Sequence, residues 1–198
     1  VFLSMLPAKP ADRRFAVAVI GLSLPLFVVA AWFARVPMTP VAAFIPAYEA
    51  ALAINETITA ILLFGQAAIL GSRSLLALAA AYLFSALMVI PHAATFPGLF
   101  APGGLLGAGP QSTAWLYMYW HAGFPLLVIG YVRLKRRDRL QGALLGSPHL
   151  AIAWTVAATI AAVVAFTALA TAGHDVLPAI MRVDHYTPSF DDRVKAAA

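Results

Sequence analysis

Residues 44–70 of the chain read FIPAYEAALAINETITAILLFGQAAIL, an apolar run interrupted by polar and ionisable side chains. A bilayer core about 30 Å thick is crossed by roughly 20 apolar helical residues, so this run is long enough to span it. Four further runs of similar length lie near residues 15–34, 75–94, 114–134 and 149–172. Five such runs cannot be hidden inside the soluble core of a 198-residue chain that is 62% hydrophobic. The sequence therefore predicts an all-α, polytopic helical membrane protein with about five transmembrane helices.

Positive charge is spread unevenly over the segments between these runs. If the N-terminus is cytoplasmic, nine basic residues fall on the inner side and four on the outer side. Cytoplasmic loops carry the excess of Lys and Arg, which favours this orientation. We expect a cytoplasmic segment 1–14, a five-span membrane domain 15–172 and an extracytoplasmic tail 173–198, in a bacterial inner membrane. The inner set is Lys9, Arg13, Arg14, Arg73, Arg133, Lys135, Arg136, Arg137 and Arg139, and the outer set is Arg35, Arg182, Arg193 and Lys195.

Composition excludes several classes of function. The 198 residues contain no cysteine, so they hold no disulfide, thiolate metal site or Cys nucleophile. The net charge of +5 comes from basic residues at membrane edges, so it indicates a lipid bilayer rather than nucleic acid as partner. There is no Gly-rich phosphate loop with a Lys and no Ser in a nucleophile elbow, and we expect no enzymatic activity.

The second run, 44–70, carries polar residues on two faces. Helical residues seven, eleven and eighteen positions apart share a face. A first stripe of four polar residues lies on one face, and Glu49 and Glu56 form a second stripe about 100° around the helix from it. Unsatisfied polar groups are costly in hydrocarbon, so we expect the first stripe to be buried against protein. That stripe consists of Tyr48, Asn55, Thr59 and Gln66.

Ionisable residues inside the membrane are the candidates for function. Glu56 lies deep in its span, so it should be protonated or paired. His92 follows Pro91 near the outer end of the third run, and His121 lies in the outer half of the fourth. Each can be a satisfied packing residue, but the location of both histidines and both glutamates in the outer half of three consecutive helices predicts an outer-half pocket. The candidate ligand-binding residues are Glu49, Asn55, Glu56, His92, Tyr117, Trp120 and His121.

What that pocket binds stays open at this point. Two imidazoles and a carboxylate suit zinc, copper or iron, but no pair has the His-x-x-x-His spacing that would indicate a metal strongly. The different depths of the two histidines disfavour a haem between them. An organic ligand such as a quinone or lipid fits the aromatic surroundings equally well. Metal and cofactor are therefore left unknown.

Several uncommon membrane motifs occur here in one order, over roughly residues 15–178. They are the segments 44–49, 54–56, 63–66, 91–93, 95–100, 107–111 and 115–125. Together they resemble the bacterial membrane-associated sensor (MASE-type) domains, in particular the fourth class. The resemblance implies an N-terminal sensory module coupled to a cytoplasmic output such as a GGDEF diguanylate cyclase or a histidine kinase.

The family's domain looks longer than this chain, with further spans after the segment that matches 174–186. We therefore expect a sensor domain truncated after five spans, either as a fragment or by loss of its output half. The leading hypothesis is a sensory input domain that binds an unknown ligand or proton in its outer half. The alternative is a non-catalytic accessory subunit of a larger membrane complex, docked on other membrane subunits or in a homodimer. A transporter comes third, because five spans without an inverted repeat suit alternating access poorly.

Overall fold

The computed structural model describes residues 9–33, 36, 41, 43–141, 147–182 and 185–186. Each helix begins and ends close to a predicted span, which confirms the all-α class. The predicted outer cation Arg35 and the tail residues 187–198 lie outside the described residues. The elements are α1 (Pro10–Phe33), α2 (Phe44–Leu70), α3 (Arg73–Thr95), α4 (Ser112–Gln141), α5 (Pro148–Ala170), a 3₁₀ turn (His174–Val176) and the two-residue strands β1 (Met181–Arg182) and β2 (His185–Tyr186).

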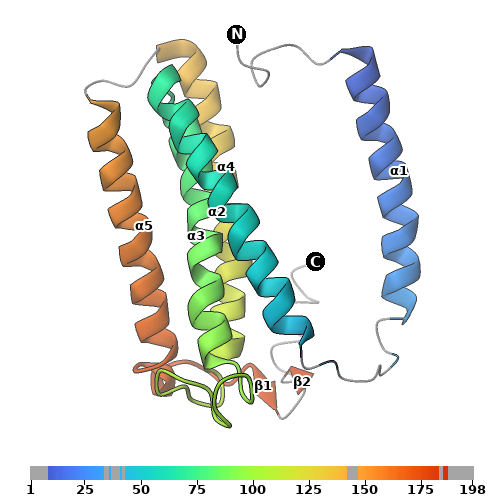
Figure 1. The fold of residues 1–198 in the computed structure, drawn as a ribbon, viewed down its shortest axis with the longest axis vertical. Helices are drawn as coiled ribbons and strands as arrows, with labels where there is room; N and C mark the ends of the chain where they lie inside the picture. Colours follow the sequence, from blue (N-terminus) through green and yellow to red (C-terminus); the bar gives the residue numbers. More distant parts are fainter. Residues whose placement is uncertain are drawn as a thin grey trace. The chain divides into compact units, whose positions relative to one another are not determined.

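Four of the described helices, α1, α2, α3 and α5, are long and apolar enough to cross a membrane, with mean hydropathies between 1.5 and 2.3. Helix α4 has 30 residues but carries aromatic side chains at its start and basic ones at its end. The start of α4 lies beside the end of α5, where the Ser112 hydroxyl donates a hydrogen bond to the Ala170 carbonyl. Helices α3 and α5 run in the same direction (Figure 1). If both cross the bilayer, α4 has to carry the chain back through it.

The chain divides into two compact units, residues 1–41 and 42–198. The first unit contains α1, in which no residue is buried. Its N-terminus is capped by Asp12, whose carboxylate accepts the Lys9 backbone N–H at 2.9 Å. Apolar side chains cover the helix on all sides, as suits a helix surrounded by lipid.

In the second unit α3 is the central helix and packs against α2, α4 and α5. The core is formed by Phe84, Met88 and Val89 of α3 together with Leu116 of α4 and neighbouring residues. Gly123 allows α4 to approach closely, because a Cβ atom there would lie 2.5 Å from the Phe84 ring. The lack of a side chain at Gly123 thus sets the spacing between α3 and α4, two of the helices that carry the site.

One end of this bundle is held by Asp138, near the end of α4. Its Oδ2 accepts the Ser72 hydroxyl at 2.8 Å and the Ser74 backbone N–H at 2.9 Å, at the start of α3. Partial burial alone would raise the pKa of Asp138, but these hydrogen bonds and the charge of Arg73 outweigh it and lower the pKa. The contact confirms that Arg73 and the basic run 133–139 lie at the same end, as the charge pattern predicts.

The opposite end is closed by the 96–111 loop and the segment that follows α5. Leu105 N–H donates to the Ala94 carbonyl at 2.7 Å, which folds the loop back over α3. Gly104 has a φ of 78°, and a Cβ there would lie 2.3 Å from the Thr95 carbonyl oxygen, so this close approach requires glycine. The Gln111 side chain accepts the N–H groups of Ile180 and Met181. The segment after α5 is therefore attached to the loop end, a contact that the sequence did not indicate.

Candidate functional site

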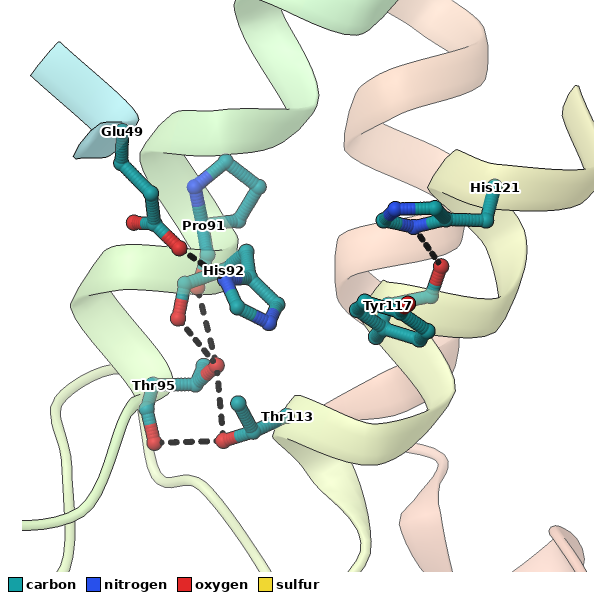
Figure 2. Close-up of polar contacts among 7 residues, drawn as sticks. All are labelled: Glu49, Pro91, His92, Thr95, Thr113, Tyr117 and His121. Atoms are coloured by element: carbon teal, nitrogen blue, oxygen red, sulfur yellow. Dashed lines mark hydrogen bonds and ion pairs between the residues drawn. The ribbon is translucent and has the colours of Figure 1, made fainter. Parts of the chain in front are cut away.

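Glu49 and His92 are brought together by the antiparallel pairing of α2 and α3. Glu49 lies in the second turn of α2 and His92 in the last turn of α3, so both sit at the loop end of the bundle. His92 Nδ1 lies 2.6 Å from Glu49 Oε1 (Figure 2). The two residues are only 7% and 4% exposed. This is a buried polar contact between two apolar helices.

At this distance the two atoms share a hydrogen bond, with a proton between Nδ1 and Oε1. The C-terminus of a helix favours a positive charge, and His92 occupies that position in α3. Among the described residues, two buried side-chain oxygens have no hydrogen-bond partner in the protein, Glu49 Oε2 and Glu56 Oε2. Both belong to the same face of α2. Each can accept a proton or a donor group from a ligand.

Aromatic rings enclose His92 on its other sides. The rings of Phe96 and Tyr117 have centroids 6.1 Å from His92, and the Trp120 ring lies 5.8 Å away and edge-on. The Trp120 indole N–H donates to the Ser85 hydroxyl. That hydroxyl also interacts with the Glu56 carboxyl group. The Ser85 hydroxyl therefore lies between the deeper carboxylate and a ring that contacts His92.

His121 lies outside this enclosure. Its ring stacks on Tyr117 with centroids 3.8 Å apart, and its Nδ1 lies 2.9 Å from the Tyr117 carbonyl oxygen. The side chain is exposed, and Figure 2 shows it on α4, away from the Glu49–His92 contact. Its ring is also 4.9 Å from that of Trp120. His121 thus touches the wall of the site but not its ionisable pair.

The last turn of α3 is held by two threonines. The Thr95 hydroxyl donates to the Pro91 carbonyl at 2.9 Å, and the Thr113 hydroxyl donates to the Thr95 carbonyl at 2.8 Å (Figure 2). The second bond joins the end of α3 to the start of α4. Sequence reasoning missed Ser85, Thr95 and Thr113, although a threonine four residues after a helical proline is a usable signal for such a bond.

The structure brings together four of the seven predicted site residues: Glu49, His92, Tyr117 and Trp120. The side chain that bonds to His92 is Glu49, and a ligand shared by Glu56, His92 and His121 stays a prediction. Tyr48 and Asn55, which we expected to be buried against protein, are exposed in the single chain. Thr59 and Gln66, in the same stripe, are half-buried at its edge. The face that packs carries the two glutamates together with the small buried residues Ala60 and Ala67.

The chemistry of this arrangement is that of a hydrogen-bonding pair rather than of a metal centre. Within the described part of the chain, no three His, Asp or Glu side chains are placed to hold a metal ion. One imidazole, one carboxylate and three aromatic rings form a low-dielectric site. Such a site can exchange a proton or bind a small organic group with a hydrogen-bond donor.

A family model described as "Membrane-associated sensor, integral membrane domain" (MASE4) matches residues 39–196. The match contains every residue of the site and the whole of α2 to β2. The chain belongs to the MASE4 family of membrane-associated sensors. Neither the curated proteins nor the solved structures gave a match. The resemblance seen in the sequence is therefore confirmed, and the MASE4 domain is an integral membrane domain with a sensory role. Its Glu49–His92 contact lies within the family's sensory unit, and α1 lies before the matched region.

Proposed function

We propose that this MASE4 domain is a non-catalytic signal-input module whose input site is the Glu49–His92 pair. It would sit in a bacterial inner membrane with residues 1–14 in the cytoplasm and 173–198 outside, and 15–172 as its five-span domain. The stimulus would be a proton or a small ligand that reaches the outer half of the membrane. The observation that carries the proposal is the 2.6 Å contact between two buried ionisable side chains on different helices.

Such a pair makes helix packing depend on protonation. An uncompensated charge is costly in a low-dielectric interior, so both partners change state together or the contact breaks. At the other end of α2, the turn to α3 is anchored through the Asp138 hydrogen bonds to Ser72 and Ser74. A change at Glu49 would therefore move the loop end of α2 while its other end stays in place. This gives a two-state element that a stimulus can bias.

The remaining site residues would take distinct roles. Phe96, Tyr117 and Trp120 form the walls that keep the pair dry, and Glu56 is a second carboxylate reached through Ser85. His121 stands outside Tyr117, where a ligand or proton from the outer half would arrive first. Aromatic walls around a few convergent polar groups are typical of small-molecule sites.

Trp120 provides the readout for a test, because its ring is 5.8 Å from His92 and a change of His92 charge alters indole fluorescence. The protein in nanodiscs is titrated with protons alone, from pH 8 to pH 4, and the emission is recorded. We expect a sigmoidal change that His92→Gln abolishes and Glu49→Gln displaces along the pH axis. His149→Gln, at an exposed residue near the start of α5, serves as matched control.

An emission change that persists in His92→Gln would contradict the proton-responsive form of the proposal. If no titration occurs in the wild type either, the pair is not a proton site. In that case only the ligand form remains, and it requires that Glu49→Gln and His92→Gln abolish signalling in the full-length protein while expression is unchanged. Retained signalling in both variants would refute the proposed site altogether.

We also propose a partner for the exposed face of α2, namely a second copy of this chain. Seven exposed residues recur there with the 3.5-residue spacing of two supercoiled helices. Asn55 carries both a donor and an acceptor, so two copies can pair across a two-fold axis, and a polar residue at such a position fixes the register. At Gly65 a Cβ would meet nothing within 4 Å, which leaves room for a second helix. The face consists of Tyr48, Ala51, Asn55, Ile58, Leu62, Gly65 and Ile69.

Single cysteines test this pairing cleanly, since the 198 residues contain none. Ala51→Cys and Ile58→Cys should form disulfide-linked dimers in membranes under mild oxidation. Ile54→Cys and Ile61→Cys, which are exposed on a neighbouring face, report random collision. Equal cross-linking at all four positions would rule out the α2 interface.

A further inference from the structure

A cavity of about 550 Å³, open as a groove, lies between α3 and α5 beside Leu106 of the 96–111 loop. Three residues of α3, six residues on and just after α5, and Leu106 of the loop line it. No charged side chain is among them, and the volume lies in the range of small-molecule sites, roughly 300–1,000 Å³. The cavity is formed by a different part of the α3 surface from that which holds the Glu49–His92 contact.

The polar groups that line the cavity are carbonyl and hydroxyl oxygens. The hydroxyl hydrogens are already donated to other groups, so these oxygens are left to accept hydrogen bonds. Pro91 has no N–H, so the Leu87 carbonyl, four residues earlier, lacks its helical partner. The Thr167 hydroxyl donates to the Val163 carbonyl at 2.7 Å, and that of Thr171 donates to the Thr167 carbonyl at 2.8 Å. A hydroxyl that donates its hydrogen still has lone pairs to accept another. The cavity therefore complements a ligand that brings a hydrogen-bond donor.

Leu106 lines the cavity in a strained conformation. With a φ of 62°, it is the only non-glycine residue of the described chain in the left-handed region. Such a conformation is unfavourable for a leucine, and it persists only where the surroundings impose it. Here the Leu105 N–H bond to the Ala94 carbonyl and the close fit of Gly104 on Thr95 hold the loop in place. Strain of this kind is concentrated at ligand clamps and switches.

We propose that this groove binds a membrane-dissolved lipid with an uncharged hydroxyl head, such as a long-chain or isoprenoid alcohol. The hydroxyl would donate to the acceptors near Pro91 and Thr167, and the hydrocarbon chain would lie against the apolar residues of α3 and α5. A carboxylate or phosphate head would find no donor among the lining groups, and an ammonium head would find no counter-charge. The proposal is independent of the function assigned to Glu49 and His92.

The test uses two photoreactive probes with the same diazirine-bearing C16 chain, one ending in a hydroxyl and the other in a methyl ester, which only accepts. Each is added to the protein in phosphatidylcholine nanodiscs, irradiated and mapped by peptide mass spectrometry. We expect saturable labelling of α3 and α5 peptides by the alcohol, competed by 1-hexadecanol and weaker for the ester. Thr167→Val, which keeps the shape but removes the acceptor oxygen, should reduce the preference about three- to tenfold, as for loss of one hydrogen bond.

Val164→Trp fills the groove from an exposed position, and it should abolish the competed labelling. Leu150→Trp, at another exposed position of α5, is the matched control and should leave it unchanged. Equal labelling by both probes, without competition, would overturn the proposal and show that ordinary acyl chains fill the groove. A preference for the alcohol that survives both Thr167→Val and Val164→Trp would overturn it as well, because the probe would then bind elsewhere.

Discussion

The Glu49–His92 contact predicts a large coupling energy between the two side chains. Breaking a buried ion pair by removing one partner costs about 3–5 kcal/mol, because the other charge is left uncompensated. Replacing both partners by apolar residues of similar size is often close to neutral. Glu49→Met and His92→Phe should therefore each destabilise the domain by about 3 kcal/mol, and the double variant by less than either. The expected coupling is well above the roughly 0.6 kcal/mol average of hydrogen bonds between membrane helices, whose maximum is about 1.7 kcal/mol.

The measurement is reversible unfolding of the four proteins in mixed detergent micelles at pH 7, followed by tryptophan fluorescence and circular dichroism. A control cycle pairs Glu49→Met with His121→Phe, because His121 stacks on Tyr117 and makes no contact with Glu49. That cycle should be additive within about 0.5 kcal/mol. A coupling below about 1 kcal/mol for the Glu49–His92 cycle would mean an ordinary neutral hydrogen bond. The charge-dependent packing on which the input mechanism rests would then fail.

Two further predictions concern the packing that positions the site. Asp138→Asn should destabilise the domain by about 0.5–2 kcal/mol at neutral pH, the range for losing a helix cap. Because the pKa of Asp138 is lowered on folding, this difference in stability should be present above the ordinary Asp pKa of 3.8 and shrink as pH falls through the lower pKa of the folded state. A difference that is unchanged at pH 2 would contradict the prediction. Gly123→Ala should cost about 1–3 kcal/mol, because the new Cβ overlaps the Phe84 ring. Gly130→Ala, in the same helix with no atom near the new Cβ, should be neutral or slightly stabilising, and equal effects of the two would refute the close-packing argument.

The helices themselves were predictable because membrane spans follow from local sequence. Each needs only a run of apolar residues, and α2 coincides with the run 44–70 that the sequence indicates. Helix α4 extends beyond its predicted end at residue 134 to Gln141, because its basic turns continue the helix past the apolar stretch. The charge pattern also placed Arg73 and the basic run at one end, as the Asp138 hydrogen bonds confirm.

The site was predictable as a neighbourhood but not as a set of contacts. The depth in the membrane predicted from the sequence indicated that Glu49, His92, Tyr117 and Trp120 share one end of the bundle. It did not indicate which side of α2 packs, because two polar stripes compete and the choice depends on the shape of α3. The glutamate face is lined by small residues such as Ala60 and Ala67, which allow close approach, whereas Tyr48 is too large to pack there. Patterns of polarity favour burial of both stripes, and only packing decides between them.

Helix α3 connects the proposed input site to the proposed lipid groove through a single turn. Pro91 lines the groove, and the next residue, His92, bonds to Glu49 on another face. The missing N–H of Pro91 weakens the helix at this turn, and the Thr95 hydroxyl bonds to the Pro91 carbonyl. A change in the Glu49–His92 bond would therefore act next to a turn of α3 that lacks one backbone hydrogen bond. A movement of this turn would change the shape of the lipid groove. Binding at one of the two proposed sites would then change the affinity of the other, and the coupling free energy would be the same in both directions.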